Sequence, residues 1–229
     1  MQKNFTKHKI PMNCTSIFKT KAIIFFILIV LTPATSVEAK NLRLFRIGTG
    51  GQTGVYYPIG KIIAQGITSN DSIEKSVRSG ENGVPGYIGV AQNSAGSIDN
   101  VRSIAAGEIE AGLIQADVAS WAFKADHVFK GNKQVQAVRA IASLYPEKFQ
   151  IVTRRDANIK NVTDLRGKRI SNDEIGSGTL AVMRIVLDAH GMTEKDFLSV
   201  YLKPVFTRDK MISGELQGFV MMAGAPMEA

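Results

Sequence analysis

The sequence predicts an α/β fold built from repeated strand–loop–helix units. Apolar, β-favouring segments alternate with segments of helical periodicity, and loops rich in Gly, Ser and Thr join them. Of the 229 residues, 45% are hydrophobic and 21% are charged, which is typical of a globular protein. This length allows one or two domains and a sizeable core.

The first unit spans residues 44–67. A β-favouring segment at 44–47 precedes four glycines, and isoleucines then follow at the spacing of an amphipathic helix over 59–67. Pro58 fits only in the first turn of that helix, because proline has no N–H to donate. Glycine lets a ligand approach the backbone, and the N–H groups at a helix start attract anions. The stretch therefore predicts one wall of a site for a small anionic ligand, although a tight turn without a ligand explains the pattern equally well.

Two nucleotide-binding motifs do not fit this loop. Gly48 and Gly50 match the start of a dinucleotide fingerprint, but Thr53 stands where its third glycine belongs. Lys61 has the setting of a P-loop lysine, but Ile62 follows it where that motif requires Ser or Thr. We therefore predict no cofactor.

Two similar units follow in the first half of the chain. Strands are predicted at 87–91 and 111–115, and Ser97 and Asp117 are expected to cap the helices after them. Ligand contact is the alternative role for Ser97. For Asp117, the alternative is that the backbone just before it, at Gln115 and Ala116, contacts the ligand.

The second half continues the pattern with a fourth helix start at residues 176–179, which is expected to face the loops of the first half. Strands are predicted at 135–144, 148–153, 200–202 and 216–222 and at the end of 164–170, with a short helix at 207–213.

Five segments together resemble the TAXI-type solute receptors of tripartite ATP-independent periplasmic (TRAP) transporters. They are residues 44–60, 94–101, 107–117, 164–170 and 176–179. The resemblance implies a type II periplasmic-binding-protein fold with two doubly wound α/β lobes, at 40–145 and 146–229. It further implies a monomer that closes on a small solute and delivers it to the TRAP membrane permease.

The residues expected to bind the solute lie in the loops at the four helix starts. They are Thr49, Gly50, Gly51, Tyr56, Asn93, Ser94, Ser97, Gln115, Asp117, Ser177, Gly178 and Thr179. These loops offer hydroxyls and backbone N–H groups rather than a charged clamp. Arg154 and Arg155 are the nearest candidates to pair with a solute carboxylate, and solvated strand-end charges explain them more simply. The resemblance suggests a glutamate-like amino acid, a dicarboxylate or a 2-oxo acid as the solute.

The first 39 residues have the pattern of a signal peptide. Five lysines precede an apolar run at 22–31, and a small-residue cleavage site ends at Ala39. Cleavage predicts a periplasmic protein, and an uncleaved membrane anchor is the alternative. Cys14 is the only cysteine and would leave with the signal, so the mature chain would have no disulfide and no thiolate metal site.

The remaining composition argues against other classes of function. Removing five lysines and one glutamate lowers the formal net charge from +8 to +4, and no dense basic run indicates nucleic acid. No metal-ligand cluster or ordered catalytic triad stands out, so we predict no metal and no enzymatic activity. An enzyme on the same fold and a non-functional fragment are the alternatives.

The TRAP resemblance also predicts that the second lobe is incomplete, because receptors of this family continue beyond residue 229. We therefore expect the apolar strand at 216–222 to lie at an unprotected sheet edge. On this interpretation, residues 40–229 alone would be poorly soluble and would bind the solute weakly.

Overall fold

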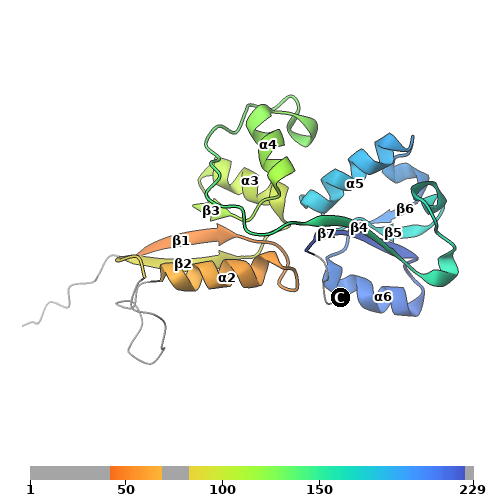
Figure 1. Ribbon diagram of the computed structural model, residues 1–229, viewed down its shortest axis with the longest axis horizontal. Coiled ribbons are helices and arrows are strands. Elements are labelled where there is room, and N and C mark those ends of the chain that lie inside the picture. Colours follow the sequence, from red (N-terminus) through yellow and green to blue (C-terminus); the bar gives the residue numbers. More distant parts are fainter. Residues whose placement is uncertain (1–41, 69–82, 225–229) are drawn as a thin grey trace, which may run out of the picture. The chain divides into compact units, whose positions relative to one another are not determined.

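The computed structural model describes residues 42–68 and 83–224, and these form two β-sheets with helices packed against them (Figure 1). The predicted signal peptide and Cys14 lie outside the described residues. Within the described ranges, no helix has the length and apolar character needed to cross a membrane.

The first sheet contains three parallel strands in the order β2-β1-β3. They are β1 (Arg43–Gly48), β2 (Tyr87–Gln92) and β3 (Ala111–Gly112). A helix follows each strand, namely α2 (Tyr56–Ile67), α3 (Ser97–Ala106) and α4 (Ala116–Lys124). The three predicted strand–loop–helix units are therefore confirmed, and Pro58 lies in the first turn of α2. Gly107, in a left-handed conformation, ends α3 as its C-cap.

The second sheet contains four strands in the order β4-β7-β5-β6. They are β4 (Lys148–Thr153), β5 (Arg169–Ser171), β6 (Leu198–Val200) and β7 (Gly218–Ala223). Strand β4 runs antiparallel to β7, whereas the other pairs are parallel. The helices of this half are α5 (Gly178–Ala189) and α6 (Thr207–Ser213), and short 3-10 turns occur at His127–Phe129, Arg155–Ala157, Val162–Leu165, Glu194–Asp196 and Pro204–Phe206.

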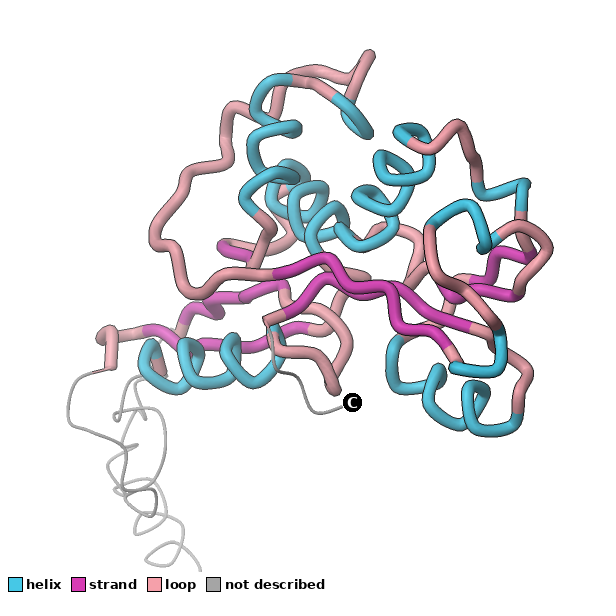
Figure 2. Tube along the Cα trace, turned by 45° about the vertical axis from the view of Figure 1, so that its right-hand side comes forward, coloured by secondary structure: helices cyan, strands magenta, loops and turns pink. Residues whose placement is uncertain are grey.

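The expected edge position of the apolar strand at 216–222 is wrong. Strand β7 is a central strand that pairs with β4 on one side and with β5 on the other. Four of its six residues are buried in succession, and a strand covered on both faces needs such a continuous apolar run. The long β4–β7 pair crosses the middle of Figure 2.

The strand expected at 135–144 is also absent, because this segment is an irregular connection between the sheets. Val135 and Val138 pack against the core formed by α3 and α4 instead of pairing with a strand. Ile141 is 86% exposed, so its β-favouring side chain finds no sheet face to cover.

Each half of the described chain has an apolar cluster that packs its helices together or against its sheet. One joins the second sheet to α5 through Ile170, Met183, Leu187 and Val220. The other gathers the helices of the first half and includes Ala181 of α5. Helix α5 therefore packs on both clusters, which fixes its N-terminus beside the loops of the first sheet.

Candidate functional site

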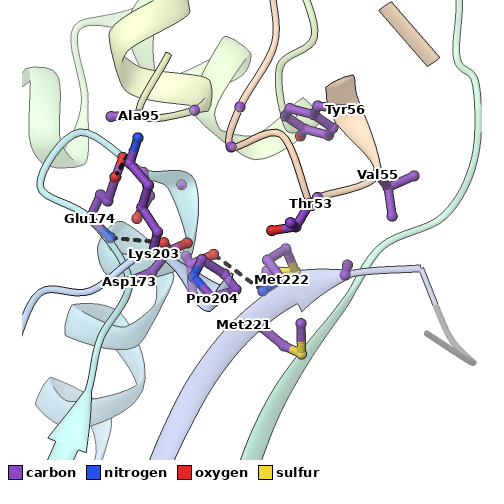
Figure 3. A pocket seen from close by; sticks show the side chains of 18 of the residues that line it. Thr53, Val55, Tyr56, Ala95, Asp173, Glu174, Lys203, Pro204, Met221 and Met222 are labelled. Atoms are coloured by element: carbon purple, nitrogen blue, oxygen red, sulfur yellow. Dashed lines mark hydrogen bonds and ion pairs between the residues drawn. The ribbon is translucent and has the colours of Figure 1, made fainter. Parts of the chain in front are cut away.

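A cavity of about 420 Å³ lies where loops of the two sheets face each other. Nine of the twelve predicted site residues line it: Gly50, Gly51, Tyr56, Asn93, Ser97, Gln115, Ser177, Gly178 and Thr179. Most of these loops follow the carboxyl ends of strands, where open α/β sheets bind ligands. Tyr56 lies on one side of the cavity, and Asp173 and Glu174 lie on the other (Figure 3).

The remaining three predicted residues, Thr49, Ser94 and Asp117, do not line this cavity. The Thr49 hydroxyl donates to the Gln92 carbonyl at 2.8 Å, and the Ser94 hydroxyl donates to the Thr49 carbonyl at 2.9 Å. Asn100 Nδ2 donates to the same Thr49 carbonyl at 2.7 Å. These bonds hold the start of the glycine-rich loop in place, so Thr49 and Ser94 position the cavity wall.

The capping roles expected for Ser97 and Asp117 are wrong. Gly96 is the N-cap of α3, and the Ser97 hydroxyl instead accepts the Gln115 N–H at 3.0 Å. Gln115 is the N-cap of α4, so Asp117 lies inside the helix, where its carboxylate accepts the N–H of Val118. Ser97 therefore ties the starts of two neighbouring helices together at the cavity.

The start of α5 forms a third part of the wall. Ser177 is its N-cap, and the Ser177 hydroxyl accepts the Leu180 N–H at 3.1 Å. The Thr179 hydroxyl accepts the N–H of Met222 at 3.2 Å. Within the described residues, the backbone N–H groups of Gly178 and Thr179 donate to no protein acceptor. The side-chain hydroxyls thus serve the fold, and the backbone N–H groups remain for a ligand.

The start of α3 and the loop just before α5 also contact each other directly. The carbonyl of Gly176 accepts the N–H groups of Ile98 and Asp99 at 3.1 and 3.2 Å. A protein carbonyl therefore occupies the donors at the start of α3 that the sequence suggested for an anionic ligand. Across the same contact, Gly178 has no room for a side chain, because a Cβ there would lie 2.2 Å from Oε1 of Gln115.

Sequence reasoning missed the charged residues of the cavity, which are Glu147, Asp173, Glu174 and Lys203. Lys203 Nζ lies 3.1 Å from Glu174 Oε1, so the two residues form an ion pair and their charges balance each other. The hydroxyl of Tyr56 donates to Glu147 Oε2 at 2.9 Å. Burial raises the pKa of Glu147 despite that bond, and burial with the nearby Glu147 charge raises the pKa of Tyr56.

Asp173 is the most perturbed carboxyl of the cavity. Burial raises its pKa to about 6, against the lowering effect of bonds to the Glu174 N–H and to the hydroxyls of Thr179 and Ser177. Its Oδ1 accepts the N–H of Glu174 at 2.8 Å. Asp173 follows β5 by two residues and has a left-handed φ of +66°. Ordinary side chains rarely adopt that conformation, which is often found at functional sites.

A signal for these residues was present in the sequence. Asp173 and Glu174 come just after β5, and Lys203 comes just after β6. The rule that ligands bind beyond the carboxyl ends of parallel strands applies to them as it does to the first half. None of these three residues is Gly, Ser or Thr, so the Gly, Ser and Thr pattern of the helix starts does not reveal them.

The two arginines considered for a solute carboxylate do not line the cavity. Arg154 forms an ion pair with Asp156 at 2.5 Å and also donates to the Met211 carbonyl. No group of His, Cys, Asp and Glu within the described residues could hold a metal ion.

The fold and the cavity together define the class. The sheet of order β2-β1-β3, the four-stranded second sheet and the cavity between their loops agree with the type II periplasmic-binding-protein fold, so the predicted fold class is confirmed. A solved structure of a protein from Bordetella bronchiseptica RB50 shares this fold, with a TM-score of 0.54 and 16% identity over 80% of this chain and 51% of its own.

Other solved structures are also similar. They include the alkanesulfonate-binding protein SsuA from Xanthomonas axonopodis pv. citri bound to MOPS, with a TM-score of 0.46 and 16% identity over 78% of this chain and 54% of its own. A putative L-cystine ABC transporter protein from Listeria monocytogenes has a TM-score of 0.46 and 14% identity over 78% of this chain and 69% of its own. The chain spans about half the length of the first of these structures. The chain belongs to the NMT1-like family, which it matches over residues 47–229.

Proposed function

We propose that this protein is an extracytoplasmic receptor that captures a small carboxylate-bearing solute and delivers it to a membrane permease. The observation that carries the proposal is the cavity between the loops of the two sheets. Its volume of about 420 Å³ is that of a site for a small organic molecule. Helix starts surround it, and their free N–H groups at Gly178 and Thr179 favour a carboxylate.

The candidate solutes are a glutamate-like amino acid, a dicarboxylate and a 2-oxo acid. Each has a carboxylate that backbone N–H groups can bind without an arginine. The cavity itself has three carboxyl side chains and one ammonium among its described lining residues, which disfavours a ligand of high negative charge.

A thermal-shift screen of the purified protein tests this function, because a ligand that binds only the native state raises the melting temperature. We expect stabilisation by at least one small carboxylate and none by glucose or by putrescine, which serve as neutral and cationic controls. Calorimetry then measures the affinity of each hit. Stabilisation by glucose alone would contradict the proposal.

The permease is proposed to be of the TRAP type, and the support is the resemblance of the five loop and strand segments to TAXI receptors. The periplasm is the compartment that this assignment requires. Uptake of a solute found in the screen into proteoliposomes with the cognate permease distinguishes the transporter types. Uptake without ATP is expected, and a strict requirement for ATP would contradict the TRAP assignment.

The proposed receptor does not transform its solute. The cavity has acidic groups and one lysine, but neither His127 nor His190 lines it. Incubation of each stabilising solute with the protein, followed by NMR of the solution, should therefore show unchanged solute. Conversion of any of them would favour the alternative that the protein is an enzyme.

A further inference from the structure

The charges around the cavity differ in how they are compensated. Glu174 is paired with Lys203 at 3.1 Å, and Glu147 accepts the Tyr56 hydroxyl at 2.9 Å. Among the described residues, Asp173 has no cationic side chain within ion-pair distance. At neutral pH it is a carboxylate that faces the cavity without a counter-ion (Figure 3).

Another residue that lines the cavity has a side-chain acceptor without a donor. Gln115 is only 8% exposed, and within the described residues its Oε1 has no hydrogen-bond partner. An unpaired buried acceptor costs free energy, so a donor that reached this oxygen from the cavity would stabilise the site. An ammonium group has three N–H donors and a positive charge, which suits a cavity with a carboxylate that has no counter-ion and an amide oxygen that has no donor.

Donors for a carboxylate lie beside Asp173. Asp173 and the first residues of α5, Gly178 and Thr179, line the same cavity, and hydrogen bonding with the Ser177 and Thr179 side chains lowers the pKa of Asp173. The free backbone N–H groups of Gly178 and Thr179 belong to the same turn. An acceptor for a cation and donors for an anion therefore lie side by side. An α-amino acid has its ammonium and carboxylate groups on one carbon, so its shape matches this arrangement.

We propose that Asp173 binds the α-ammonium group of the solute, so that the protein is a receptor for an amino acid rather than for a 2-oxo acid or a dicarboxylate. This inference rests on the proposed receptor function and selects one of its three candidate solute classes. Asp173 is the residue that determines the specificity. The ammonium supplies the counter-ion that the protein itself does not provide.

The test compares amino acids with the 2-oxo acids of the same carbon skeleton. Calorimetry measures the affinities of glutamate and 2-oxoglutarate, alanine and pyruvate, and leucine and 4-methyl-2-oxopentanoate, with glutarate as the dicarboxylate. Each pair differs only at the α-carbon. We expect at least one amino acid to bind about tenfold or more tightly than its oxo partner, the effect of one hydrogen bond to a charged group.

The variant Asp173→Asn should abolish this preference. Asparagine has the same shape and tolerates a positive φ, so the loop should keep its conformation. The variant should lose about tenfold or more in affinity for the amino acid and little or none for the oxo acid, whose binding also shows that the site is folded. Asp188→Asn changes the charge identically on the exposed face of α5 and should retain the preference.

Each other outcome has a defined meaning. Equal or tighter binding of an oxo acid or of glutarate would overturn the inference and leave the receptor proposal intact. An amino-acid preference that survives Asp173→Asn would overturn the role of Asp173. Binding of none of these compounds by a protein that melts cooperatively would overturn both proposals.

Discussion

Replacing Asp173 with asparagine should stabilise the ligand-free protein at neutral pH. Burial raises the pKa of Asp173 from 3.8 to about 6, so the folded protein holds a proton at this site more tightly than the unfolded chain does. Between about pH 4 and pH 6 the folded state therefore binds more protons, and the free energy of unfolding falls as the pH rises. Ionisation of Asp173 thus destabilises the fold, and this cost is complete above pH 6.

The free-energy cost of ionising Asp173 in the folded protein follows from the rise in its pKa. About two pKa units at 1.36 kcal/mol each correspond to roughly 3 kcal/mol, and solvent contact of this partly buried carboxyl makes that an upper value. Asparagine keeps an Oδ1 to accept the Glu174 N–H, so the loop retains that hydrogen bond. The variant should gain about 1–3 kcal/mol at pH 7.5 and should match the native protein near pH 4.

Urea denaturation at a series of pH values measures this difference, with the fluorescence of the half-buried Trp121 as the signal. The gain of the variant should grow between about pH 4 and pH 6 and remain constant above that range. Asp188→Asn should show no such trend. A constant difference across the whole range, or a loss of stability at pH 7.5, would refute the reasoning that an ionised Asp173 strains the empty site.

Three further changes test other parts of the site. Gly178→Ala would place a Cβ 2.2 Å from Gln115 Oε1, so we expect the variant to lose at least about 1 kcal/mol of stability in urea denaturation and to bind the solute more weakly in calorimetry. Unchanged stability and affinity would show that the Gln115 side chain moves aside without cost. Tyr56→Phe removes the hydrogen bond to Glu147 and should cost about 1.5–3 kcal/mol of stability, and urea midpoints equal to the native ones would contradict this. Ser177→Ala removes the cap of α5 and should lower stability by about 1 kcal/mol, as measured by urea denaturation; a loss of affinity without a loss of stability would show that its hydroxyl serves the ligand instead.

The parts of the fold that were predictable from sequence are those with strong local signals. The isoleucine stripe after the glycine loop predicted α2, and Gly107 predicted the end of α3. Strand 148–153 and helix 207–213 also have the predicted bounds. In each case, side-chain periodicity or a left-handed glycine determines the local conformation before any tertiary contact forms.

The errors concern contacts between distant segments. Residues 135–144 have strand-like composition, but a strand needs a partner, and Val135 packs on helices instead. The central position of β7 depends on its pairing with β4 and β5, which the local sequence does not encode. Pairing between strands far apart in sequence is set by tertiary packing.

The candidate site shows the same division. The loops that surround the cavity were found from their glycines and hydroxyls, and nine predicted residues line it. The hydroxyls of Ser97 and Thr179 nevertheless bond to the protein backbone, because Gln115 and Met222 reach them from other units. Their contribution to solute binding stays a prediction.

The central place of β7 in its sheet affects how the protein folds. The strands of the first sheet lie within residues 43–112, so they can pair as soon as that segment is free to fold. In the second sheet, the described residues give β4 no neighbour other than β7, which lies some 65 residues further along the chain and inserts between β4 and β5. Strand β4 therefore keeps both edges open until β7 reaches it, and an unpaired strand edge is a template for pairing with another chain.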